Sequence, residues 1–301
     1  MHYDVIINRE SGSGFFKEKE KEEKLRDLFR QHGYSLDLQI LPPAKIDEAI
    51  ADKIKSPAEV LIVGGGDGTI NATAAKLLHS EKTLGVLPLG TFNLEARDLK
   101  LSLDPLVAAE QLLQAETVEI DVLKVGEHIC LCATVLGFYP TLAKHRESFH
   151  GKAWWNKSVR IVYEIFTIAT RSPALVLTLS SATEKVTRKT RLAAFSPGQY
   201  HDSIGIIPER DSLDSGKLNA YISNHLSRTA LLKASVKYLS GTLFNPKDMT
   251  LIEGRELLIE TRKNKVIPAM IDGEIVTLKL PCQLKIEPRA LKVLQVNGEN
   301  S

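Results

Sequence analysis

Four glycines and an aspartate follow a short apolar run in the first third of the chain. The run Val60–Val63 is typical of a buried parallel strand, and it leads directly into Gly64–Thr69, which reads GGGDGT. Glycine lets a backbone approach a ligand closely, and the helix expected over Ile70–His79 would direct free N–H groups at a phosphate. Asp67 suits this place if a metal ion bridges its carboxylate to phosphates. The segment predicts a phosphate site; the structural alternative is a tight turn capped by Asp67.

The segment differs from two better-known phosphate loops. No Gly-Lys-Ser/Thr follows it, so it is not a Walker A loop, and its spacing is not Gly-x-Gly-x-x-Gly.

Six motifs, in the same order along nearly the whole chain, resemble the diacylglycerol kinase catalytic-domain family. That family also contains sphingosine and ceramide kinases and bacterial relatives, and NAD kinases share its GGDGT element. The motifs are Asn8 with Ser11-Gly12, Gly65–Asn71, Leu87–Arg97, Asp121, Leu136–Phe138 and Asp272–Glu274. The resemblance implies a lipid kinase that uses ATP and Mg²⁺.

The resemblance also implies roles for individual residues. Phosphoryl transfer to an alcohol requires a held triphosphate, a metal that neutralises charge and an acceptor for the hydroxyl proton. Glu274 is the expected base, Asp272 supports it, and Asp67 and Asp121 are expected to hold Mg²⁺ directly or through water. The expected nucleotide-binding residues are Asn8, Ser11, Gly12, Gly65, Gly66, Asp67, Gly68, Thr69, Asn71, Thr91 and Asn93.

Two positions depart from the family pattern. Leu94 stands where the second motif usually carries an aspartate of the metal network. Ser215 stands where a second aspartate usually binds a structural Mg²⁺ with nearby carbonyls, at Ser212–Lys217. A neutral hydroxyl is a weaker Mg²⁺ ligand than a carboxylate, so we expect a site of Ser212, Ser215 and Lys217 to be weakened or lost.

The elements that must position these residues change in character near residue 120. Before it, strands alternate with helices, which predicts a Rossmann-like, doubly wound α/β domain over 1–122, rejoined by 288–301. After it, short strand-like runs predict an all-β sandwich over 123–287, with helices inserted at 152–170 and 228–240. The runs in that second domain are 118–125, 129–136, 174–180, 192–195, 218–222, 256–261, 269–271, 274–280 and 283–287. The active site is expected in the cleft between the domains, with Asp272 and Glu274 projecting from a β-turn towards Gly66, Asp67 and Asp121.

The composition argues against nucleic acid and zinc as ligands. The 301 residues carry a net charge of +2, which does not favour nucleic acid, and three cysteines without metal-ligand spacing do not favour zinc. No secretory signal and no apolar stretch of roughly 20 residues is visible, so we expect a reduced, cytoplasmic protein at the inner face of the membrane.

The expected partner is a membrane lipid, reached by peripheral contact through the amphipathic stretch 152–171; packing of that stretch on the sheet is the simpler interpretation. A homodimer is left open. Two other functions also stay open: an NAD kinase-like enzyme with a soluble substrate, and a catalytically weak nucleotide-binding regulatory module, which Leu94 and Ser215 would favour.

Overall fold

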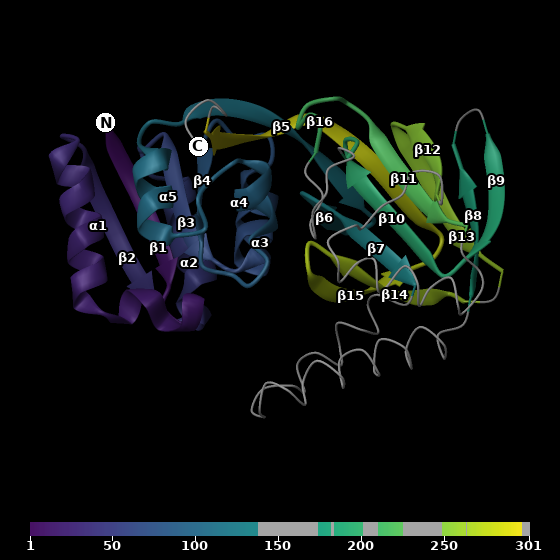
Figure 1. Cartoon of the computed structure of the whole chain (residues 1–301), viewed down its shortest axis with the longest axis horizontal. Helices are drawn as coiled ribbons and strands as arrows, with labels where there is room; N and C mark the ends of the chain where they lie inside the picture. The colour runs from purple at the N-terminus through teal and green to yellow at the C-terminus, as the bar shows by residue number, and fades with distance from the viewer. Residues whose placement is uncertain (138–173, 182–183, 201–209, 225–248, 263, 297–301) are drawn as a thin grey trace. The chain divides into compact units, whose positions relative to one another are not determined.

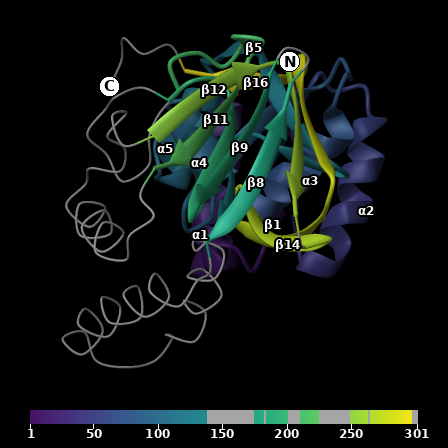
Figure 2. The same ribbon diagram turned by 90° about the vertical axis from the view of Figure 1, so that its right-hand side faces the viewer.

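The computed structural model describes residues 1–137, 174–181, 184–200, 210–224, 249–262 and 264–296. The chain divides into two compact units, each with its own core. The first contains Met1–Val122 and Pro288–Ser301, and the second contains Leu123–Glu287 (Figures 1 and 2). The helices expected at 152–170 and 228–240, and Phe138, lie outside the described residues.

The first unit is an α/β domain built on a parallel sheet in the order β2-β1-β3-β4, with the last part of β16 beside β4. Every residue of β3 and β4 is buried, as expected when helices cover both faces of a sheet. Helix α1 packs against α5, and α2 against α3 (Figure 1). Its elements are β1 His2–Asn8, the 3₁₀ helix η1 Gly12–Lys17, α1 Lys19–Gln31, β2 Ser35–Leu41, α2 Pro43–Ile54, β3 Val60–Gly65, α3 Asp67–Leu77, β4 Thr83–Pro88, α4 Leu94–Asp98, α5 Pro105–Leu112 and the start of β5 Glu116–Val125.

The N-termini of helices α5 and α3 can be compared with the positions predicted from the sequence. The Asp104 side chain accepts hydrogen bonds from the N–H groups of Leu106 and Val107, which confirms the predicted start of α5. Helix α3 begins at Asp67, three residues earlier than we expected from its apolar pattern. Gly66 is extended and its carbonyl accepts the Ile70 N–H, so Asp67, Gly68 and Thr69 already belong to the first helical turn.

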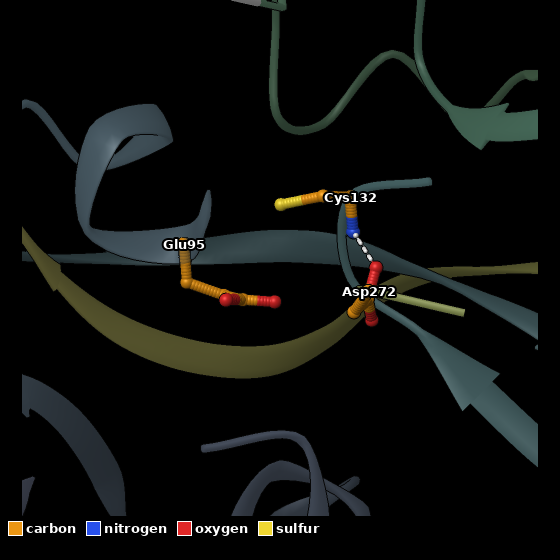
Figure 3. Close-up of side chains that lie close together, drawn as sticks. All are labelled: Glu95, Cys132 and Asp272. Carbon is orange, nitrogen blue, oxygen red and sulfur yellow. Dashed lines mark hydrogen bonds between the residues drawn. The ribbon is translucent and has the colours of Figure 1, made fainter. Parts of the chain in front are cut away.

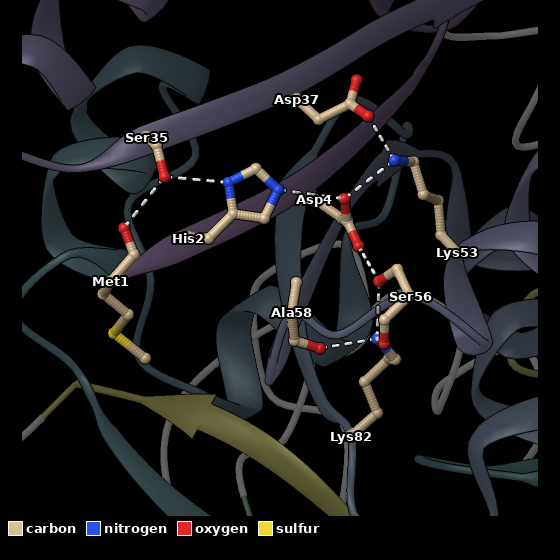
Figure 4. Close-up of polar contacts among 9 residues, drawn as sticks. All are labelled: Met1, His2, Asp4, Ser35, Asp37, Lys53, Ser56, Ala58 and Lys82. Carbon is tan, nitrogen blue, oxygen red and sulfur yellow. Dashed lines mark hydrogen bonds and ion pairs between the residues drawn. The ribbon is translucent and has the colours of Figure 1, made fainter.

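A buried charge cluster, the amino-edge cluster, closes the N-terminal edge of this sheet (Figure 4). Asp4 is fully buried; its carboxylate lies 2.9 Å from Lys53 Nζ and accepts a hydrogen bond from the Ser56 hydroxyl. Lys82 donates to Ser56 Oγ at 2.9 Å and to the Ala58 carbonyl at 2.6 Å. Burial lowers the pKa of Lys82. Burial also acts to lower the pKa of Lys53, but its bonds to Asp37 and Asp4 outweigh burial and raise that pKa.

The second unit is a β-sandwich. One sheet runs β12-β11-β10-β7-β14-β15, and the other contains β13, β8 and β9 beside the first part of β16. The inward residues of both sheets form one apolar core. The strands are β6 His128–Cys130, β7 Thr134–Gly137, β8 Leu175–Ser180, β9 Lys185–Thr190, β10 Leu192–Pro197, β11 Leu218–Ser223, β12 Met249–Gly254, β13 Glu256–Thr261, β14 Val266–Ile271, β15 Glu274–Lys279 and β16 Cys282–Gln295.

Three features of this unit differ from the sequence-based expectation. The single strand expected over 129–136 is split into β6 and β7, because the backbone of 131–133 binds a side chain instead of a neighbouring strand. Strands β9 and β12 were not predicted. Both lie at the end of their sheets and bury few side chains, so their sequences carry little apolar pattern.

Candidate functional site

The site begins with Asp67 at the start of α3. Its Oδ1 accepts the Leu94 N–H at 2.8 Å and its Oδ2 accepts the Asn93 N–H at 3.3 Å. Asp67 therefore caps the N-terminus of α4, although Asn93 occupies the capping position. One carboxylate thereby joins the predicted glycine segment to the second motif, which are neighbours in space but 26 and 27 residues apart in sequence.

The loop of the second motif is tightly closed on itself. Asn93 adopts a left-handed conformation with φ of 50°, and its side chain accepts the Gly90 N–H at 2.6 Å and donates to the Gly90 carbonyl at 3.2 Å. A Cβ on Gly90 would lie 3.0 Å from the Gly66 Cα and 3.2 Å from Asp67 Oδ2. Only glycine lets the two loops approach this closely. Gly90 was not named as a site residue, although the motif Leu87–Arg97 contains it; helix α4 was also missed.

The turn after β1 joins the same edge of the sheet through Leu89. The Leu89 N–H donates to the Gly65 carbonyl at 3.1 Å, and the Leu89 side chain lies 3.3 Å from the place a Cβ would take on Gly12 and 3.0 Å from that on Gly64. Asn8 Oδ1 accepts the Glu10 N–H, and the Asn8 carbonyl accepts the Ser11 N–H. The structure thus brings together the segments that carry most of the predicted nucleotide-binding residues.

The chemistry of this edge suits an anion. Gly66 gives α3 an N-cap without a side-chain hydrogen bond, so the first turn keeps N–H groups that no side chain caps. These groups carry the positive end of the helix dipole at the carboxyl end of a parallel strand, where open α/β sheets bind ligands. Thr91 is exposed, and Asn71 on α3 is half-buried.

Asp121 performs a structural task in the first unit. It lies on β5, is 1% exposed, and its Oδ1 accepts the Arg289 N–H at 2.9 Å. Arg289 has a φ of 49°, so Asp121 holds β16 at a left-handed residue. Its role at Mg²⁺ remains a prediction.

In the second unit, Asp272 and Gly273 form the predicted turn, between β14 and β15. Their φ values of 45° and 86° are the left-handed pair that a two-residue type I′ hairpin requires, and Ile271 pairs with Glu274 across it. Glu274 is exposed. How this turn relates to the glycine segment involves both units and stays a prediction.

The Asp272 side chain holds the hairpin against the segment between β6 and β7. Its Oδ2 accepts the Leu131 N–H at 2.7 Å, and its Oδ1 accepts the N–H groups of Cys132 and Ala133 at 2.9 Å each. Figure 3 shows the bond from Cys132. Asp272 is 1% exposed, so these bonds compensate a buried carboxylate and fix the turn that carries Glu274.

The three cysteines of this unit are buried, and none of them forms a disulfide. Cys130 Sγ lies 3.5 Å from Asp272 Oδ1. Burial, followed by the negative charge of Asp272, raises the pKa of the Cys130 thiol well above its usual value, so Cys130 is a packing residue and not a nucleophile. Cys132 lies outside a strand, contrary to expectation, because its N–H binds Asp272.

The loop of the expected structural metal site is closed by protein hydrogen bonds. The Lys217 carbonyl accepts the Gly198 N–H at 2.9 Å, and the Ser215 hydroxyl accepts the Lys217 N–H at 3.3 Å. Arg210 donates to the Pro197 carbonyl at 2.8 Å. The Ser215 hydroxyl is neutral and a weaker Mg²⁺ ligand than the carboxylate of the family pattern, so the weakening or loss of the structural metal site stays a prediction.

In the part of the chain that the structure describes, no helix combines the length and apolar character needed to cross a bilayer.

Two family models cover most of the chain. Residues 2–125 match the diacylglycerol kinase catalytic domain, and residues 162–295 match the YegS C-terminal NAD kinase beta sandwich-like domain. The two matches confirm the resemblance to the diacylglycerol kinase catalytic-domain family and the α/β-plus-sandwich fold. A match to a kinase catalytic domain implies the use of ATP.

Individual relatives agree with this assignment. A Staphylococcus carnosus protein called "Putative lipid kinase" is 25% identical over 244 residues, which are 79% of this chain and 78% of its own. A Staphylococcus epidermidis protein of the same description is 27% identical over 258 residues, 83% and 81% of the two chains. A crystal structure described as "a putative diacylglycerol kinase from Bacillus anthracis" has a TM-score of 0.74 at 20% identity and covers 99% of this chain and 95% of that one, so the fold is shared.

Proposed function

We propose that this protein is an ATP- and Mg²⁺-dependent lipid kinase that transfers the γ-phosphate to the hydroxyl of a diacylglycerol-like lipid or related lipid alcohol. The observation that carries the proposal is the Asp67 linkage, which holds the glycine segment and the second motif together at the start of α3.

The first unit supplies the nucleotide site in this proposal. The N–H groups at the start of α3 bind phosphate oxygens, and Gly66 and Gly90 keep side chains out of the space beside them. Thr91 and Asn71 add polar groups at this edge. Because a loose transition state spreads charge over the phosphoryl oxygens, pre-positioned N–H donors stabilise it without reorganisation.

Asp67 also fits an ion. Its two oxygens each accept one backbone N–H, and a carboxylate offers about four lone-pair sites, so Asp67 keeps acceptor capacity for Mg²⁺ or a water bound to it. Mg²⁺ would neutralise phosphate charge there. With Leu94 in place of the family's aspartate, Asp67 and Asp121 are the carboxylates to which the resemblance assigns this task.

In this proposal, the hairpin between β14 and β15 acts on the lipid that accepts the phosphate. Glu274 accepts the lipid hydroxyl proton as the new bond forms, and Asp272 holds the turn in place through its three backbone bonds. We propose that the lipid comes from a membrane that the protein touches peripherally.

A phosphotransfer screen tests the proposal. The protein is incubated with labelled ATP and Mg²⁺ against extracted membrane lipids, and products are identified by mass; NAD serves as the soluble competitor substrate. A labelled lipid supports the proposal. Labelled NADP would establish the NAD kinase alternative, and nucleotide binding without transfer to any acceptor would favour the regulatory module.

A further inference from the structure

Basic residues gather at one end of the β-sandwich. In the sheet, Lys189 of β9 pairs with Val176 of β8, and on the other side of β8 Leu177 pairs with Thr261, the last residue of β13. Arg262, one residue further, therefore lies level with Val176. The register places Lys189, Val176 and Arg262 in one row across three adjacent strands, and Arg188 is the next residue along the edge strand.

The turn after β13 adds further cations to this end. Thr261 Oγ1 donates to the Asn264 carbonyl at 2.7 Å, which keeps the turn short and brings Lys265 back beside the strand ends. Lys265 leads into β14, where Val266 pairs with Lys279 of β15. We call Arg188, Lys189, Arg262, Lys265 and Lys279, together with Val266, the basic corner.

The basic corner is both charged and apolar. All five cationic side chains are exposed, and among the described residues none of them lies within ion-pair distance of a carboxylate. Elsewhere on the same unit, Lys185, Lys217 and Lys285 each pair with a glutamate. Val266 is 53% exposed; it follows Lys265 in the chain and pairs with Lys279 across β14 and β15.

We propose that the basic corner docks the sandwich on an anionic phospholipid surface. The proposal rests on the proposed function, because a lipid kinase must meet its acceptor at a membrane. Each Lys or Arg near an anionic leaflet contributes about 1 kcal/mol, and an exposed apolar side chain among them can enter the interface. Nucleic acid is the less favoured occupant, since the corner contains no aromatic side chain for base stacking.

The test is vesicle sedimentation with the full chain. Vesicles of phosphatidylcholine alone are compared with vesicles containing phosphatidylglycerol, without ATP. Wild type should bind only the anionic vesicles, and binding should weaken as salt rises, because the Debye length falls from about 10 Å at 0.1 M to 3 Å at 1 M. The double variant Arg262→Glu/Lys265→Glu should bind about 25-fold more weakly or worse. Lys45→Glu/Lys55→Glu, at exposed positions on α2 and at its C-cap, makes the same charge change and should retain most of the binding.

If both double variants lose vesicle binding equally, the binding depends only on net charge and the proposal is overturned. Unchanged vesicle binding by Arg262→Glu/Lys265→Glu would also overturn it. Preference of wild type for an RNA oligonucleotide over anionic vesicles would overturn it in favour of nucleic acid. Activity on lipid dispersed in nonionic detergent micelles is measured separately. If wild type binds vesicles but phosphorylates no lipid in micelles, the lipid kinase proposal fails while the docking surface stands.

Discussion

The Asp67 carboxylate accepts the backbone N–H of Leu94 at 2.8 Å, which makes one side chain both a helix cap and the candidate metal-site acid. Asp67→Ala should abolish Mg²⁺-dependent turnover and lower the free energy of unfolding by about 1–2 kcal/mol through loss of the cap, with the fold retained. Steady-state kinetics and urea unfolding measure the two effects. Asp104→Ala removes the cap of α5 and should lower stability by about 1 kcal/mol with turnover unchanged. Wild-type turnover in Asp67→Ala would exclude Asp67 from the mechanism.

Glu274→Gln tests the proposed base, because it keeps the side-chain size and removes the proton acceptor. Turnover should fall about 10²-fold or more, while nucleotide affinity, measured by calorimetry, changes little. Glu184→Gln, at another exposed acid of the sandwich, is the matched control. If both variants keep full turnover, another group accepts the proton.

Ser215→Asp should strengthen ion binding in the loop where we expect the wild-type site to be weakened or lost. An added carboxylate supplies the hard anionic ligand that the Ser215 hydroxyl cannot, so the variant should bind Mn²⁺ measurably more tightly than wild type by electron paramagnetic resonance. Ser181→Asp, in a turn of the same unit, controls for added charge. A tightly bound ion in this loop of the wild-type protein would contradict the expectation.

The amino-edge cluster should contribute strongly to stability. Asp4→Ala removes the only buried carboxylate of the cluster but leaves Asp37 as a partner for Lys53, so we expect a loss of about 3 kcal/mol, the lower end for breaking a buried pair. The loss is measured from the shift of the urea unfolding midpoint, provided that the denaturant m-value does not change. Asp47→Ala, which breaks the exposed pair with Lys76, should have little effect. Similar midpoints for the two variants would show that the cluster is not stabilising.

The raised pKa of the Cys130 thiol predicts that the folded protein loses stability at alkaline pH. Its pKa is raised in the folded protein, so between that value and the ordinary thiol pKa of about 8.5 the unfolded chain binds fewer protons than the folded one. Stability should therefore fall as pH rises above about 8.5, and Cys130→Ala should show a shallower fall over the same range. If stability falls with pH equally in wild type and in Cys130→Ala, the Cys130 thiol does not contribute to the pH dependence.

The sequence predicted those features that local patterns determine. Apolar runs located β3 and β4, and Asp104-Pro105 located the start of α5. The missed features depend on contacts between distant residues. The split between β6 and β7 comes from an aspartate 139 to 141 residues away, and α4 is capped by Asp67 and not by its own preceding side chain. No spacing rule in the sequence reports such pairs.

Strand β16 has a consequence for synthesis on the ribosome. Its first residues pair with β13 in the sandwich, while Val293 pairs with Leu84 of β4, and the Ala290 carbonyl accepts the His79 N–H in the first unit. Most of the first unit is therefore synthesised before the sandwich but completed after it, because the edge of its parallel sheet stays open until the last part of β16 leaves the exit tunnel. We expect the nascent first unit to remain a client of chaperones through most of translation, whereas the sandwich can close before it.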